Sequence, residues 1–284
     1  MAQFTNQARL SYNDTVVNSN IAVGEIRDLL SASKDALAGT YRAGDRVTYV
    51  ISIVNSGPAP YTGLTMTDDL GAYTYGTGTL TPLTYVDGSL RYFVNGVLQA
   101  TPTPTADAPL TVPGIAVPAG GNALLIYETR VNSFAPLDTE STVTNTATLS
   151  GAGLTTPVQA ASTVNARAAA YLTIGKAVSP ATVAENGTLT YTFTIQNYGN
   201  TAAAETDNVT VSDTFSPILK AISVTYNGAA WTEGTQYTYN AATGAFATTA
   251  GQITVPAASL TRDAATGAVV VTPGISTLTV TGTV

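Results

Sequence analysis

The chain has 284 residues, a length that fits two domains of ordinary size, each with its own hydrophobic core. It contains no Cys and no His, which excludes thiolate nucleophiles, disulfides, thiolate or imidazole metal sites and histidine acid–base chemistry. Charged residues make up only 10% and the net charge is −7, so we expect no binding of nucleic acid. We therefore expect a protein that is not an enzyme and that holds no metal and no cofactor.

The N-terminal sequence Met-Ala-Gln-Phe-Thr has no basic region followed by an apolar one, so we expect no recognisable signal peptide. No run approaches 18 uninterrupted apolar residues, and we expect no membrane insertion. If the protein acts outside the cell, we expect its export not to depend on such a signal peptide. Release by lysis, including lysis of the mother cell around a spore, is one alternative route.

The first 23 residues are predicted to form two strands. Residues 4–11 read Phe-Thr-Asn-Gln-Ala-Arg-Leu-Ser and match residues 143–150, Val-Thr-Asn-Thr-Ala-Thr-Leu-Ser, in one register. Residues 24–30 are either a turn of helix or a linker. We expect the apolar side chains of this segment, which would otherwise be exposed to water, to enter an acceptor core. These are Phe4, Ala8, Leu10, Tyr12, Val16, Val17 and Ile21.

An internal repeat organises the rest of the chain. Residues 47–57 align with residues 189–199, and Lys34 and Lys176 keep the same offset. Two further blocks, 64–68 and 125–131, align with 209–213 and 278–284. The first copy continues for two more alternating strands, up to residue 164. The second copy stops earlier, so we expect it to lack its last two strands.

The strands are predicted from period-two alternation bounded by Gly, Pro, Asn and Asp. In residues 47–54 and 189–195, alternate positions place large apolar side chains on one face. Hairpins are expected at Asn95-Gly96, Asn227-Gly228 and Asp87-Gly88. No segment has an apolar period of 3.6 residues with helix caps. The sequence predicts an all-β protein with a donor-strand segment (1–26) and two tandem β-sandwich domains (27–168 and 169–284), the second one incomplete.

Several motifs together resemble the conserved repeat domain known as DUF11, which is similar to the isopeptide-forming domains of Gram-positive pilins. They are Lys34, Gly44-Asp45-x-Val-Thr-Tyr, Asn55-x-Gly57, Thr67-Asp68-Asp69-Leu70 and Thr144-Asn145-Thr146-Ala147-Thr148. The second half lacks the Thr-Asn-x-Ala block, which stands at Thr5-Asn6-Gln7-Ala8 instead. The resemblance implies immunoglobulin-like domains in tandem on a bacterial surface, without enzymatic activity.

In isopeptide-forming pilin domains, a Lys of the first strand attacks an Asn side chain of a late strand beside a buried acid. The resemblance therefore implies a bond between Lys34 and Asn145, with Asp68 or Glu128 as the acid. Burial is needed to shift the pKa of the amine and of the acid. The alternative is structural: a lysine at a sheet edge or in an ion pair, and an asparagine in a turn.

Lys176 has no late-strand asparagine in its own repeat. By the same resemblance its partner would be Asn6 of the next subunit, with Asp213 as the acid. The structural alternative applies here as well.

An incomplete sandwich leaves backbone groups unpaired and a core uncovered, while a free N-terminal segment exposes apolar side chains. Inserting the segment of one chain into the second domain of another solves both problems, as in strand complementation of pilins. Head-to-tail insertion gives an open filament. Insertion into the same chain, small rings and a free tail are the alternatives. We predict a homopolymer, the structural subunit of an extracellular bacterial filament on a cell or spore surface.

The competing function is a soluble adhesin or carbohydrate-binding module. Its candidate platform is Trp231 with Tyr226, Tyr237 and Tyr239, although such aromatics commonly form cross-strand pairs or core in β-proteins. Asp68-Asp69 and Asp207-Asn208 are rich in oxygen, but no loop has EF-hand spacing, and we expect these residues to form turns.

Overall fold

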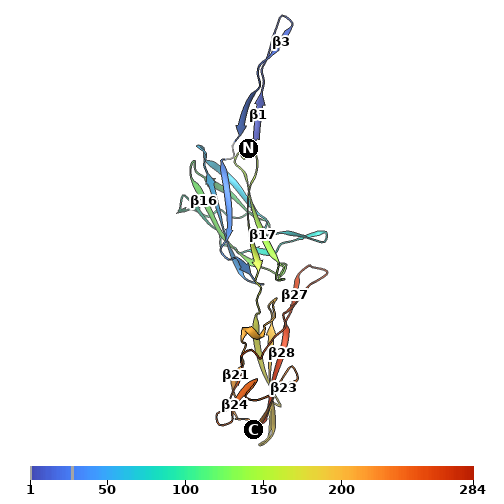
Figure 1. Ribbon diagram of the computed structural model, residues 1–284. Helices are drawn as coiled ribbons and strands as arrows, with labels where there is room; N and C mark the ends of the chain where they lie inside the picture. Colours follow the sequence, from blue (N-terminus) through green and yellow to red (C-terminus); the bar gives the residue numbers. More distant parts are fainter. Residues whose placement is uncertain (1, 27–28) are drawn as a thin grey trace.

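A computed structural model describes residues 2–26 and 29–284 and shows an elongated all-β protein (Figure 1). A hairpin extends from one end, and the C-terminus lies at the other. Between them are two separate hydrophobic cores, one formed within residues 30–166 and one within residues 189–280. We call the parts around them the first body and the second body. Within the described ranges, no helix is long and apolar enough to cross a membrane.

The N-terminal hairpin is a two-stranded ribbon that extends away from the first body (Figure 1). Its strands are β1 (Ala2–Asn6), β2 (Arg9–Tyr12), β3 (Thr15–Asn18) and β4 (Ala22–Ile26), and β1 pairs with β4 while β2 pairs with β3. Asn13 and Asp14 close it with φ of 41° and 60°, as a tight hairpin turn requires. The predicted alternative of a helical turn at residues 24–30 is wrong for residues 24–26, because these belong to β4. Arg27 and Asp28 lie outside the described residues.

The first body is a sandwich of two six-stranded sheets. One has the order β13 (Val97–Leu98), β12 (Arg91–Val94), β16 (Asn122–Val131), β7 (Arg46–Asn55), β5 (Leu30–Ala36), and β11 (Leu83–Tyr85) also pairs with β16. The other has the order β14 (Ala106–Asp107), β15 (Leu110–Val117), β8 (Tyr61–Asp68), β17 (Thr142–Gly151), β18 (Val158–Ala166), β6 (Thr40–Tyr41). A separate hairpin consists of β9 (Tyr73–Tyr75) and β10 (Gly78–Leu80).

The alternation in the sequence sets which side chains form this core. Val47, Tyr49, Ile51 and Ile53 of β7 are completely buried, while the residues between them are partly or fully exposed. β16 shows the same two-residue pattern along its length. The predicted inward face of residues 47–54 is therefore confirmed.

The second body has a five-stranded sheet and a three-stranded sheet. The larger has the order β19 (Leu172–Ser179), β20 (Thr188–Asn197), β28 (Gly274–Thr283), β22 (Lys220–Tyr226), β23 (Ala229–Trp231). The smaller has the order β21 (Ser212–Thr214), β25 (Ala245–Thr248), β24 (Tyr237–Asn240). A 3-10 turn (Glu205–Asp207) and a hairpin of β26 (Ser259–Arg262) and β27 (Val269–Thr272) complete it.

Two of the three predicted hairpin turns are confirmed. Asn95-Gly96 joins β12 to β13 and Asn227-Gly228 joins β22 to β23, each with positive φ at both residues. Asp87-Gly88 forms a turn, but the prediction of a hairpin there is wrong. The flanking strands β11 and β12 both pair with β16 and not with each other.

The β26–β27 hairpin reaches from the second body to the first. The Arg262 guanidinium lies over the rings of Tyr73 and Tyr75, with 5.6 and 5.1 Å from its central carbon to the ring centroids. The Val269 amide donates a hydrogen bond of 2.7 Å to the carbonyl of Ser133. The hairpin therefore braces the two bodies against each other.

We predict that Arg262→Ala loosens this brace. Each cation–π contact at an exposed site contributes about 0.5–1 kcal/mol, so losing two should increase the freedom of the second body. Small-angle X-ray scattering of the monomeric protein should show a broader distance distribution. Arg9→Ala, which removes an exposed charge from the N-terminal hairpin at the other end of the molecule, is the control. Identical scattering from Arg262→Ala and the wild type would mean that the hairpin does not brace the bodies.

Candidate functional site

Lys34 lies at the centre of the first body, on β5, and its side chain is completely buried. Its Nζ is 2.6 Å from Oδ2 of Asp68 and 4.7 Å from the ring centroid of Tyr49. The hydroxyl of Tyr127 donates a hydrogen bond to the same carboxylate oxygen. The amide of Leu70 donates to the other oxygen of Asp68 at 2.9 Å. The carboxylate is thus shared between the ammonium group and two further donors.

Burial changes the protonation of this cluster. It lowers the pKa of Lys34, and the charge of Asp68 opposes that shift. It also raises the pKa of Tyr49 and of Tyr127, so both phenols stay protonated. The amine of Lys34 is therefore closer to its neutral, nucleophilic form than a lysine in water.

Asn145 lies on β17, near the hydroxyl groups of Tyr49 and Tyr127. The residue is completely buried, yet neither Oδ1 nor Nδ2 has a hydrogen-bond partner in the described part of the chain. Leaving a buried polar atom unpaired costs about 1–3 kcal/mol. The structure thus brings Lys34 and Asp68 into contact and places Asn145 near the two tyrosines beside them, while a bond between Lys34 and Asn145 stays a prediction.

Glu128, the other candidate acid, lies elsewhere. It is on β16 with its side chain 37% exposed, and its Oε2 is 2.6 Å from the guanidinium of Arg46. Of the two candidate acids, Asp68 is the one in contact with Lys34. Sequence reasoning did not select Tyr49 and Tyr127, although alternation placed Tyr49 on the inward face.

The second body carries an equivalent pair. Lys176 on β19 forms an ion pair with Asp213 on β21, and its Nζ is 4.6 Å from the ring centroid of Tyr191. Tyr191 occupies the repeat position of Tyr49. The surroundings differ, because the side chain of Lys176 is 42% exposed and that of Asp213 is 19% exposed.

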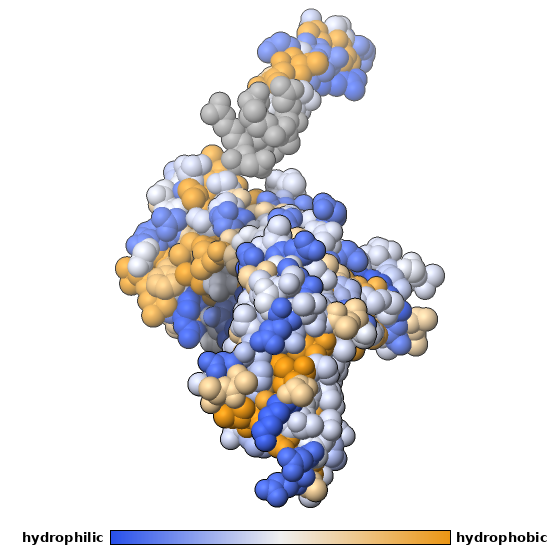
Figure 2. Space-filling view, turned by 60° about the horizontal axis from the view of Figure 1, so that its bottom comes forward, coloured by the Kyte–Doolittle hydropathy of each residue, from blue (hydrophilic) through white to orange (hydrophobic). Residues whose placement is uncertain are grey.

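The difference in exposure follows from the closing strands. In the first body β17 pairs with β8, and the amide of Ala36 on β5 donates a 3.0 Å hydrogen bond to Ser162 on β18. In the second body β21 pairs with β25 on one side, and none of the described strands pairs with its other side. No described strand takes the place of β18 beside β19, so Ile174 and Val178 are 57% and 42% exposed. Figure 2, in which the second body comes forward, shows apolar surface on that end of the molecule.

The N-terminal hairpin exposes the side chains predicted to be donated. Phe4, Leu10, Tyr12, Val16, Val17 and Ile21 are each between 46% and 62% exposed, and Ala8 is exposed too. Asn6 is exposed on β1. Isolated exposed apolar residues are ordinary, but a contiguous set on one ribbon marks an interaction surface.

The pairing within the hairpin repeats that of the first body's closing strands. Leu10 pairs with Val17 as Leu149 pairs with Val158. Asn6 pairs with Ala22, whereas Asn145 pairs with Ser162. Ala22 follows Val17 by five positions but Ser162 follows Val158 by four, so the return strand of the hairpin contains one additional residue. The hairpin is thus a second copy of the β17–β18 pair with no sheet beside it among the described residues.

The aromatic residues of the alternative function are packed. The rings of Trp231 and Tyr226 lie 5.0 Å apart, and Tyr237 is buried 5.6 Å from Phe246. Tyr239 is half-buried and donates a hydrogen bond to the carbonyl of Leu219 at 2.7 Å. They form cross-strand and core contacts and not an open platform.

Of the aspartates considered for calcium, Asp68 belongs to the ion pair with Lys34, while Asp69 and Asp207 accept hydrogen bonds in turns. Oδ1 of Asp69 accepts hydrogen bonds from the amides of Gly71 and Thr146 at 2.8 and 2.9 Å. Asp207 accepts one from the amide of Ala204 at 2.8 Å.

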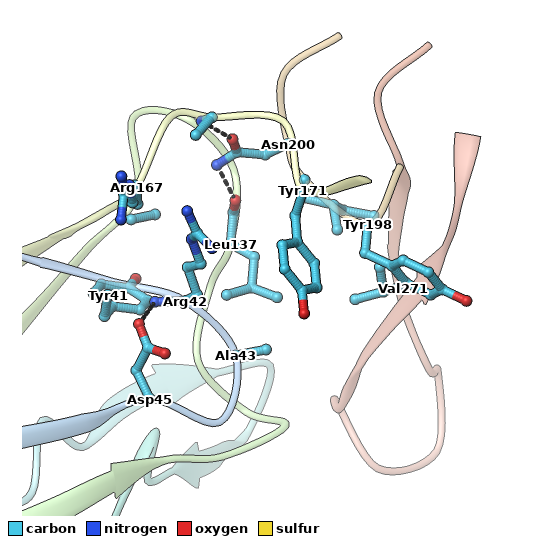
Figure 3. Close-up of a pocket in the computed structure, with 14 residues that line it drawn as sticks. Tyr41, Arg42, Ala43, Asp45, Leu137, Arg167, Tyr171, Tyr198, Asn200 and Val271 are labelled. Atoms are coloured by element: carbon cyan, nitrogen blue, oxygen red, sulfur yellow. Dashed lines mark hydrogen bonds between the residues drawn. The ribbon is translucent and has the colours of Figure 1, made fainter. Parts of the chain in front are cut away.

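A cavity of about 330 Å³ lies where the two bodies meet (Figure 3). The guanidinium of Arg42 lies 5.4 Å from the ring centroid of Tyr171, across the junction. Asn200 joins the bodies by donating to the carbonyl of Leu137 at 2.8 Å. None of the predicted lysine, asparagine or donor residues lines this cavity.

Neither a family model nor a curated protein matches this sequence. Among solved structures, the pilus backbone RrgB of Streptococcus pneumoniae aligns over 86% of this chain and 55% of its own, with 11% identity and a TM-score of 0.35. BcpA, the major pilin subunit of Bacillus cereus, aligns over 94% and 70%, with 9% identity and a TM-score of 0.36. The chain thus spans about half the length of RrgB. Likenesses at this level carry no argument about function, and the resemblance to the conserved repeat domain rests on its motif residues alone.

We predict that Lys34→Met destabilises the first body strongly. It leaves the carboxylate of Asp68 buried without its cation, which costs about 3–5 kcal/mol. Chemical denaturation should show this loss, and Lys34→Met with Asp68→Leu should recover much of it. Lys220→Met, at an exposed lysine without an ion pair in the described residues, should be nearly neutral. Equal stability of Lys34→Met and Lys220→Met would contradict this account.

Proposed function

We propose that this chain is the structural subunit of an extracellular bacterial filament, on a cell or spore surface, that assembles head to tail by donor-strand complementation. Residues 1–26 are the donor segment, 27–168 the first domain, and 169–284 a second domain completed by a neighbouring copy. One contrast carries the proposal. The same lysine–aspartate pair is buried under two strands in the first body and exposed in the second, and a matching pair of strands stands free at the other end.

Donation would satisfy both exposed surfaces. The hairpin would pair with the free side of β21 and cover Ile174, Lys176 and Val178 on β19, as β17 and β18 cover β5. Main-chain hydrogen bonds supply affinity in such strand addition, and inserted side chains supply specificity. Interfaces of obligate assemblies bury roughly 2,000–5,000 Å², and their dissociation requires partial unfolding.

The geometry favours an open chain of copies. The hairpin and the second body lie at opposite ends of the elongated molecule (Figure 1). Insertion into the same chain would require the molecule to fold back on itself. A head-to-tail contact that does not close on itself generates a filament.

We also propose that Lys34 and Asn145 join covalently. A proton passes from Lys34 to Asp68, and the neutral Nζ attacks Cγ of Asn145. Asp68 returns this proton to Nδ2, and a second proton is transferred from Nζ to Nδ2. The new Nζ–Cγ bond replaces the Cγ–Nδ2 bond, Asp68 is ionised again, and Nδ2, which carries four protons after the two transfers, leaves as ammonium. The unpaired amide of Asn145 and the lowered pKa of Lys34 support this proposal.

The corresponding bond in the filament would join Lys176 to Asn6 of the inserted hairpin, with Asp213 in the role of Asp68. Before insertion, water reaches Lys176 and no asparagine of the late-strand type lies beside it in the described second body. Insertion would supply the asparagine and exclude the water together. The bond would then form only in the assembled state.

Deleting residues 1–23 should abolish polymerisation while the first body still folds, because that body has its own closing strands. Size-exclusion chromatography and negative-stain imaging should show long polymers for the full chain and monomers for the deletion. Leu10→Asp should weaken assembly as well, because it places an unpaired charge in the acceptor core, at a cost of several kcal/mol.

Long fibres from the deletion variant under native conditions would overturn donor-strand assembly. Unchanged assembly by Leu10→Asp would mean that the donated face or the register is different.

Fibres boiled in detergent should run as a ladder of covalent multimers, each junction lighter by one ammonia in mass spectrometry. Lys176→Ala or Asn6→Ala should collapse the ladder to monomer. Lys34→Ala should keep the ladder, since its bond lies within one chain, but each chain should regain one ammonia in mass. Wild-type fibres that run wholly as monomer would show that no intermolecular bond forms.

A further inference from the structure

Phe4 and Gly24 form an unusual pair in the hairpin. They lie opposite each other on β1 and β4. A Cβ atom built on Gly24 would lie 2.3 Å from Cζ of Phe4 and 2.6 Å from Cε1, so the ring occupies the space of a side chain at position 24. Gly24 does not have a positive φ, and its backbone conformation does not require glycine. The glycine therefore makes room for the ring, an arrangement also used to rescue glycines in designed sheets.

The first body has a different pair at this place. The match between residues 4–11 and 143–150 puts Phe4 at the position of Val143, whose partner on β18 is Val164. Both valines are buried in the first core, with exposures of 2% and 0%. The corresponding pair of the hairpin thus has one large ring on the first arm and no side chain on the second.

The strands beside the closing pairs also differ between the two bodies. In the first body, β5 presents Ala32 and Ala36 to the core, and β18 covers it with Ser162 beside Ala36. In the second body, the same register on β19 presents Ile174 and Val178. The second arm of the hairpin has Ala22 and Gly24 where β18 has Ser162 and Val164. Beside Ala36 the first body has Ser162, so the equivalent pair would be the smaller donor residue Ala22 and the larger acceptor residue Val178. At the position of Phe4, Val143 lies so close to Gly71 that a Cβ atom on Gly71 would be 2.5 Å from its Cγ1, and a phenyl ring does not fit there.

We propose that Phe4 folded over Gly24 is the specificity-determining anchor of the hairpin, which selects the second body of another copy over a first body. This inference rests on the proposed filament. A first body could otherwise exchange its own β17 and β18 for the hairpin, since the two share a register. Specificity between related partners commonly depends on such a steric mismatch against the wrong one.

The test is Gly24→Val in the full chain, with assembly followed by light scattering and negative-stain imaging. The added side chain forces the ring of Phe4 away, and overpacking at a close-fitting site should slow assembly by at least about tenfold. Val23→Ala, on the opposite face of the hairpin, should assemble at the wild-type rate. The hairpin is exposed in the monomer, so near-UV circular dichroism should show both bodies folded in all variants.

Normal assembly of Gly24→Val, with the wild type also polymerising, would overturn the anchor and leave the filament intact. Absence of polymers from the wild type would overturn the filament and the anchor with it. Equal slowing by Val23→Ala would show that the effect is not specific to the face that carries Phe4.

Discussion

The closing of a β-sandwich over a buried ion pair is the constraint on which the rest of this molecule depends. A lysine and an aspartate can lie inside a protein only if they are paired and if the strands around them satisfy the remaining polar groups. In the first body, β17 and β18 provide that cover, and the pair of Lys34 and Asp68 is dry. In the second body the same residues are in place without the cover, and water reaches Lys176. The two bodies therefore hold the same pair of residues in a fully buried and in a partly exposed form.

This constraint also explains why β21 is shorter than its counterpart β8. The aligned blocks 64–68 and 209–213 predict equivalent strands, but β8 extends over Tyr61–Asp68 whereas β21 extends only over Ser212–Thr214. β8 has a partner on each side, β15 and β17, while β21 has β25 on one side in the described chain. Without a second row of hydrogen bonds, the backbone on that side keeps its bonds to water, and the ladder ends early.

The sequence predicted the features that depend on local pattern. Alternation placed Tyr49 inward, and the Asn-Gly pairs placed two hairpins, because both signals act over a few residues. The family resemblance placed Lys34, Asp68 and Asn145 in one candidate site. Alternation favours Asp68 over Glu128, because Asp68 shares the inward face of β8 whereas Glu128 is on the outward face of β16, but the contact with Lys34 required tertiary geometry. The hydrogen bond from Tyr127 to Asp68 joins residues far apart in the chain and has no local signal.

The brace between the bodies was also beyond local reasoning, and it has a consequence for the proposed filament. The dipeptide Val255-Pro256 aligns with Val117-Pro118 of the first body. The β26–β27 hairpin lies between Val255-Pro256 and the start of β28, whereas the first body has only the turn Pro118–Gly121 before β16. Only the second body thus has the insertion that contacts its N-terminal neighbour through Arg262 and Val269. In a filament, joints within one chain would carry this brace, whereas joints between chains would rest on the inserted hairpin and the short connection that follows it. Stiff and compliant joints would therefore alternate along the fibre, with bending concentrated where one copy meets the next.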